Sequence, residues 1–155
     1  MRLAISSDHG GFALKGEIIK YLKEKNIQLD DLGTYSEESV DYPDYALAVA
    51  EAVSAGTFGL GIICCGTGIG VSISANKVPG VRAALCHDTF SARMAREHND
   101  ANVLTLGQRV IGVGLALDIV QSFLDARFEG GGRHSRRLEK MCAIEKKYCK
   151  ESGTL

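Results

Sequence analysis

The chain has 155 residues, the length of one ordinary domain, with 45% hydrophobic and 24% charged residues and a formal net charge of -1. This composition excludes a largely disordered protein, and we predict a single domain over residues 1–155. Because there is no basic excess and no apolar run of about 18 residues, we expect neither a nucleic acid nor a membrane as partner.

Short apolar runs and amphipathic stretches alternate along the chain. Strands are predicted at residues 3–6, 27–32, 59–64, 81–85 and 102–106. Helices are predicted from about 12 to 26, from 45 to 53, from the end of the glycine-rich segment at 65–70 to about 76, from 88 to about 97, from 111 to 123 and from about 134 to 150. The five alternations are typical of an α/β protein whose parallel sheet is covered by helices on both faces.

Polar clusters follow four of the predicted strands, at residues 7–11, 65–70, 86–88 and 107–109. Right-handed crossovers bring every strand-to-helix loop to the same edge of a parallel sheet. We therefore expect these clusters to lie together there, although they are far apart in the sequence.

The most informative cluster is the glycine-rich loop Cys-Gly-Thr-Gly-Ile-Gly at residues 65–70. Backbone N–H groups of such a loop, with the start of the following helix, can hold a phosphate or a developing oxyanion. The loop matches neither the Walker motif nor the dinucleotide-binding fingerprint. A tight turn that merely requires positive φ angles is the alternative interpretation.

The cysteines indicate one functional thiol among structural ones. Cys65 lies at the start of the glycine loop, where its thiolate could act as a base or a nucleophile. Cys64 should point the opposite way, into the core. The five cysteines show no CxxC spacing, so we expect neither a zinc site nor a dithiol centre, and the four scattered histidines indicate no metal site. An odd number of cysteines also argues against a disulfide framework and fits a cytoplasmic protein. The same location is expected because Asp8 follows the start too closely for a signal peptide.

Three further groups could carry chemistry or could be structural. Asp8 and His9 could contact a ligand or cap a helix. His98 could be a helix C-cap. Arg133 and Arg137 are four residues apart, so they could clamp a dianion from one helix face or belong to a solvated charge run.

Six of these segments occur in order between residue 1 and about residue 147. They are residues 7–11, 41–43, 65–70, 75–77, 97–102 and 131–134. Together they resemble the ribose-5-phosphate isomerase B family, whose relatives are allose-6-phosphate isomerase and the galactose-6-phosphate isomerase subunits. One branch of that family has a glutamate base where this chain has Val71, so the resemblance is to the cysteine branch.

The resemblance implies a three-layer α/β/α sandwich whose five parallel strands have the order 2-1-3-5-4. It implies a pentose phosphate pathway enzyme that interconverts ribose 5-phosphate and ribulose 5-phosphate without a metal or cofactor. The partner would be a small-molecule sugar phosphate. The assembly would be a homodimer or a dimer of dimers with active sites shared between chains.

The resemblance also implies a role for each matching residue. Cys65 would move the proton between C1 and C2, with help from Thr67, while Asp8 and His98 would open the sugar ring. The amides holding the enediolate would belong to Gly66, Thr67, Gly68, Ile69 and Gly70. Other sugar contacts would be Tyr42 and Asn99, and the phosphate contacts would be His9, Arg109, Arg133 and Arg137. Of these, His98, Asn99 and Arg109 would reach into the site of the other chain.

Three alternatives differ in chemistry. The first is the same isomerisation of a hexose 6-phosphate, such as allose 6-phosphate. The second is a sugar-phosphate-binding protein without activity, which the intact Cys65, Thr67 and His98 disfavour. The third is a thiol redox protein, which the missing resolving cysteine disfavours.

Overall fold

The computed structural model describes residues 2–149. Its strands are β1 (Leu3–Ser7), β2 (Leu29–Asp31), β3 (Leu60–Cys65), β4 (Ala83–Leu85) and β5 (Val103–Gly107). Its helices are the short 3-10 turn η1 (His9–Gly11), α1 (Phe12–Glu24), α2 (Tyr42–Ser54), α3 (Ile69–Ala75), α4 (Thr89–Asn99), α5 (Val113–Asp125) and α6 (Gly132–Tyr148). Within these residues, no helix has the length and apolarity that a bilayer crossing needs.

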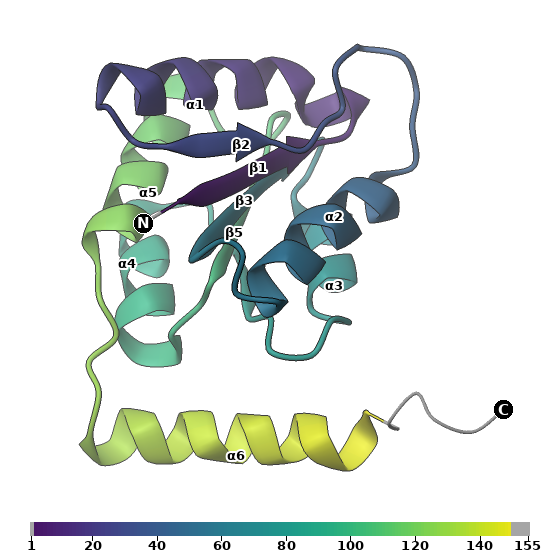
Figure 1. Ribbon diagram of the computed structural model, residues 1–155. Helices are drawn as coiled ribbons and strands as arrows, with labels where there is room; N and C mark the ends of the chain where they lie inside the picture. Colours follow the sequence, from purple (N-terminus) through teal and green to yellow (C-terminus); the bar gives the residue numbers. More distant parts are fainter. Residues whose placement is uncertain (1, 150–155) are drawn as a thin grey trace, which may run out of the picture.

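The sheet is parallel and has the strand order β2-β1-β3-β5-β4. Helices α1, α4 and α5 lie on one face, and α2 and α3 lie on the other (Figure 1). The predicted three-layer α/β/α sandwich and its strand order are therefore confirmed. In such a sheet the order of the strands changes direction beside β1 and β3, which is where ligands bind in this class of fold.

The central strand β3 is buried along its whole length, because helices cover both of its faces. Successive side chains point to opposite faces of a strand. Cys64 accordingly joins the core beneath α1 and α5, and Cys65 joins the core beneath α2 and α3. The prediction that the two adjacent thiols point in opposite directions is confirmed.

Two helices begin earlier than the sequence pattern predicted. Helix α2 starts at Tyr42 rather than at residue 45, with Pro43 in its first turn. A proline is tolerated there because the first helical N–H groups have no partner inside the helix. The last helix starts at Gly132 rather than near 134, and residue 150 of its predicted end lies outside the described residues.

Helix α6 lies apart from the three layers, across the end of the molecule that is drawn at the bottom of Figure 1. It touches the domain through α4 and through Glu145, whose carboxylate accepts the Gly80 N–H at 3.1 Å. Its large apolar side chains Met141, Ile144 and Tyr148 are 39%, 61% and 72% exposed. One copy of the chain therefore leaves most of this helix uncovered.

A buried ion pair fixes the end of β2 against α1. The ammonium of Lys15, 2% exposed, donates to both carboxylate oxygens of Asp31 at 2.6 and 2.8 Å and to the Thr34 carbonyl at 2.6 Å. The Thr34 N–H in turn donates to the Ser7 carbonyl at the end of β1. Lys15 thus anchors the segment that leads from β2 into the loop beside the sheet edge.

Replacing Lys15 with methionine is expected to lower the free energy of unfolding by about 3 kcal/mol, because Asp31 then keeps a charge without its counterion. Urea denaturation measures the loss. Lys23→Met on the exposed side of the same helix is the control, with an expected change of about 0.5 kcal/mol or less. Equal losses in the two variants would contradict a structural role for the pair.

Candidate active site

A cavity of about 220 Å³ opens at the carboxyl edge of the sheet, where the loops after β1, β3 and β5 meet. Three of the four clusters predicted at this edge contribute to it, namely residues 7–11, 65–70 and 107–109. Its lining residues are Asp8, His9, Gly10, Tyr42, Cys65, Gly66, Thr67, Gly70 and Arg109.

Cys65 is the nucleophilic group of this cavity. Its side chain is 5% exposed, and its Sγ accepts the N–H of Gly68 at 3.0 Å. The glycine loop thus holds the Cys65 sulfur in place, close to further backbone N–H groups.

The glycine loop keeps its shape through close backbone contacts. Gly68 has a φ of 78°, a conformation that side chains with a Cβ rarely adopt. Gly107 lies against the loop, and a Cβ there would come within 2.5 Å of the Thr67 carbonyl. The shape of the loop is therefore set by Gly68 within it and by Gly107 at the end of β5.

Asp8 and His9 are held in place from β1. The Asp8 carboxylate accepts the Gly11 N–H at 3.0 Å, so it caps η1 while lining the cavity. His9 Nδ1 accepts the Val40 N–H at 3.2 Å. Because Nδ1 is an acceptor, the neutral ring carries its proton on Nε2 and can donate it to a ligand.

Tyr42 and Arg109 complete the lining from opposite sides. The Tyr42 ring packs against Gly70, where a Cβ would lie 2.7 Å from the ring. Arg109 follows β5, and a Cβ on Gly66 would lie 3.6 Å from its guanidinium. Arg109 therefore lies in the cavity of its own chain, which corrects the expectation that it reaches into the site of a second chain.

The cluster at residues 86–88 follows β4 but does not line the cavity. Cys86 is buried in the core, and this burial raises its pKa to about 11. Asp88 caps α4 by accepting the Ser91 N–H at 2.7 Å, which lowers the pKa of this exposed carboxyl. Cys64 is likewise a core thiol, with its pKa raised far above the usual range by burial.

Six predicted site residues do not line the cavity around Cys65: Gly68, Ile69, His98, Asn99, Arg133 and Arg137. His98, in the last turn of α4, stacks on His134 of α6, with ring centres 4.2 Å apart and ring planes 13° from parallel. Arg133 and Arg137 lie close enough to His134 to lower its pKa. The chain thus carries a second group of residues, His98, His134, Arg133 and Arg137, outside the Cys65 cavity.

The second group brings together donor types that bind metals, but its geometry does not fit a metal centre. Donor atoms of His98, Glu129 and His134 lie within 4.8 Å of one another. The lone pair of an imidazole lies in its ring plane, and two nearly parallel, stacked rings cannot both aim at a shared ion. His134 Nε2 also accepts the Arg133 Nε–H at 3.3 Å, so it is already occupied.

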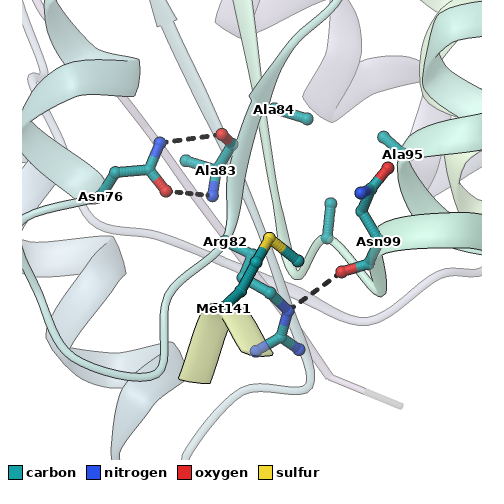
Figure 2. Close-up of a pocket in the computed structure, with 8 residues that line it drawn as sticks. Asn76, Arg82, Ala83, Ala84, Ala95, Asn99 and Met141 are labelled. Carbon is teal, nitrogen blue, oxygen red and sulfur yellow. Dashed lines mark hydrogen bonds between the residues drawn. The ribbon is translucent and has the colours of Figure 1, made fainter. Parts of the chain in front are cut away.

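Asn99 lines another cavity, of about 260 Å³, between α4, β4 and α6 (Figure 2). The Asn99 carbonyl accepts the Arg82 Nε–H at 3.2 Å, and Asn76 pairs with the backbone of Ala83 through two hydrogen bonds. The carboxylate of Asp100, the next residue, accepts hydrogen bonds from the guanidinium groups of Arg82 at 2.8 Å and Arg96 at 3.0 Å. These contacts fix the end of α4 that carries His98 and Asn99.

Sequence reasoning did not single out Glu129 or a role for His134. His134 stands in a run of basic residues, and Glu129 precedes three glycines, so both look like parts of a polar surface. What joins them to His98 is the packing of α6 across the end of α4, which no local pattern reveals.

Comparisons with known proteins agree with this geometry. The profile of the ribose/galactose isomerase family matches residues 3–141. Ribose-5-phosphate isomerase B of Escherichia coli is 49% identical over 94% of this chain and 97% of its own length. The solved structure of ribose-5-phosphate isomerase B of Clostridium thermocellum is 57% identical in sequence, with a TM-score of 0.93 over 96% of this chain and 99% of that chain.

A third relative was solved with a ligand. It is ribose-5-phosphate isomerase B of Mycoplasma genitalium with bound ribulose 5-phosphate, 45% identical, with a TM-score of 0.89 over 94% of this chain and 96% of that chain. Fold, strand order and sequence agree over nearly the whole chain. This protein belongs to the ribose/galactose isomerase family.

Proposed function

We propose that this protein is an isomerase that interconverts ribose 5-phosphate and ribulose 5-phosphate, with Cys65 as its base. The observation that carries the proposal is the Cys65 sulfur, which accepts the Gly68 N–H at 3.0 Å inside the cavity. The names of relatives at 49% and 57% identity support the choice of substrate.

The reaction needs a base for a carbon acid and donors for the oxyanion that follows. After ring opening, the Cys65 thiolate takes the proton from C2 of the open-chain aldose, and the electron pair moves into the carbonyl to give an enediolate. The Thr67 hydroxyl and backbone N–H groups of the loop donate to its oxygens, apart from the Gly68 N–H, which is bound to the Cys65 sulfur. A proton then passes from the C2 hydroxyl to the C1 oxygen of the enediolate. The Cys65 thiol returns its proton to C1 as the C2 carbonyl forms, which leaves the ketose with all atoms balanced. Preorganised donors of this kind contribute about 3–4 kcal/mol each.

The phosphate requires cationic groups at the far end of the sugar. Arg109 and the Nε2–H of His9 already lie in the cavity. Arg133 and Arg137 lie in the second group of residues, with His98 and His134. We propose that each of two copies places this second group over the Cys65 cavity of the other, so that two shared sites form.

Exposed apolar side chains on α2, α3 and α5 support this pairing, because a monomer seldom leaves so many uncovered. On α2 and α3 they are Leu47, Ile69 and Ile73, between 44% and 58% exposed. Before and within α5 they are Val110, Val113 and Leu115, between 42% and 49% exposed. The homodimer could assemble further into a dimer of dimers. A cytoplasmic location is proposed with it, since all five cysteines are free thiols.

The assay that tests the proposed function follows ribulose 5-phosphate formation from ribose 5-phosphate with and without EDTA. We expect turnover that EDTA does not change, because no step above uses a metal. Allose 6-phosphate, offered at the same concentration, is expected to react more slowly. Absence of turnover on ribose 5-phosphate would contradict the proposal, and faster turnover of allose 6-phosphate would assign the hexose instead.

A further inference from the structure

Charged side chains surround the stacked imidazoles of His98 and His134. Helix α6 contributes Arg133 and Arg137, and the segment before α6 contributes the carboxylate of Glu129. The donor atoms of Glu129, His98 and His134 lie within 4.8 Å of one another. An acidic group therefore lies inside a cluster of basic ones.

The backbone fixes the position of Glu129. Its N–H donates to the Glu97 carbonyl at 2.9 Å, one residue before His98. On its other side, the Gly131 N–H donates to Ser135 Oγ at 2.7 Å, which ties the glycine segment to the first turn of α6. The backbone of Glu129 is therefore held at the junction of α4 and α6, and its carboxylate lies within 4.8 Å of the donor atoms of the stacked rings.

The geometry of the stack disfavours a positive charge on both rings at once. Two imidazolium ions with ring centres 4.2 Å apart would repel each other strongly. Burial lowers the pKa of His134, and the neighbouring His98, Arg133 and Arg137 lower it further. Glu129 acts in the opposite direction, because its negative charge favours the protonated ring.

We propose that Glu129 is a positioning residue whose carboxylate keeps one proton on the His98–His134 pair, ready for transfer to the sugar. In ring opening the sugar's ring oxygen takes this proton as its bond to the anomeric carbon breaks. The anomeric hydroxyl gives its own proton to a base, the role assigned to Asp8. This second half of the inference rests on the proposed function; the first half concerns the free protein.

Glu129→Gln removes the charge and keeps the shape, so it separates the two halves. In the substrate-free protein, NMR titration follows the ring signal of His134, identified by its loss in His134→Asn. The midpoint is expected to move to lower pH by about half a unit or more. In the isomerase assay, the alkaline limb of kcat is expected to move in the same direction, with KM unchanged within about twofold because the arginines remain.

Two further variants control the charge. Glu139→Gln removes the same charge from an exposed position on α6 and is expected to leave the His134 midpoint in place. Glu129→Asp retains the charge and is expected to return most of the midpoint shift. A midpoint unchanged in Glu129→Gln, or moved equally in Glu129→Asp, would overturn the inference.

The outcomes for the two proposals are distinct. An inactive wild-type protein would contradict the proposed function, while the His134 midpoint would still decide whether Glu129 holds the proton. An active wild-type protein whose kcat profile is the same in Glu129→Gln would overturn the role of Glu129 in ring opening and leave the isomerase intact.

Discussion

Cys65→Ala is expected to lower kcat for ribose 5-phosphate by about a hundredfold to ten-thousandfold, the usual contribution of a positioned base. The alanine keeps the buried position filled and the glycine loop in place, so the sugar phosphate should still bind. Steady-state kinetics measure the loss of kcat. Retained binding is measured by adding excess variant to the wild-type assay, where it lowers the rate by binding part of the ribose 5-phosphate.

Cys64→Ala is the matched control, because it removes the neighbouring thiol from the same strand. Cys64 packs in the core on the other face of the sheet, so its loss should cost about 1 kcal/mol of stability and little activity. A Cys65→Ala variant with near-normal kcat would show that another group is the base.

Arg137→Ala is expected to raise KM for ribose 5-phosphate by roughly tenfold to a hundredfold, since a charge-assisted contact is worth about 1.5–3 kcal/mol. Turnover of free ribose, which has no phosphate to hold, should change little. The comparison of the two substrates therefore separates a phosphate contact from a structural role.

Arg136→Ala removes the same charge from the adjacent position of α6. Arg136 is exposed and is not among the groups that act on His134, so it should face away from the second group. We expect its KM for ribose 5-phosphate to stay within about twofold of the wild-type value. Equal losses on ribose 5-phosphate and free ribose in Arg137→Ala would show that this arginine is structural.

The fold could be predicted from the sequence because its signals are local. The apolar run of β3 and the glycines that follow it indicate a strand buried on both faces and a turn into a helix. The start of α2 escaped prediction, since Tyr42 and Pro43 follow a polar loop and resemble its continuation. Only the resemblance to a family supplied the strand order.

The site was predictable in part. Cys65, Asp8 and the glycine loop follow strands, and the topology of a parallel sheet brings such residues together. The turn after β5 decides whether Arg109 lies in the cavity of its own chain or in that of a second chain. In this turn the Arg109 N–H donates to the Gly66 carbonyl at 3.0 Å. That turn bends Arg109 back over its own loop.

The second group was the least predictable part. His98 and His134 are brought together by α6 lying across the end of α4, a contact between elements separated by a strand and a helix. Glu129 enters through its backbone bond to Glu97. Such contacts depend on tertiary packing, which leaves no periodic trace in the sequence.

The central claim is that two copies of the chain share each active site, and subunit mixing tests it. Cys65→Ala and His98→Ala, each inactive alone and carrying different affinity tags, are unfolded together in equal amounts and refolded. Random pairing makes half of the dimers mixed, and each mixed dimer then has one site with both defects and one with neither. About a quarter of wild-type activity should therefore return, in the fraction that carries both tags.

The converse mixture sharpens the result. Wild-type protein refolded with an equal amount of the Cys65→Ala/His98→Ala double variant should retain about a quarter of the activity if sites are shared, because each site in a mixed dimer then has one defect. If both residues served within one chain, this mixture would retain about half. The single variants would then recover nothing despite proven exchange, and the shared site would be contradicted.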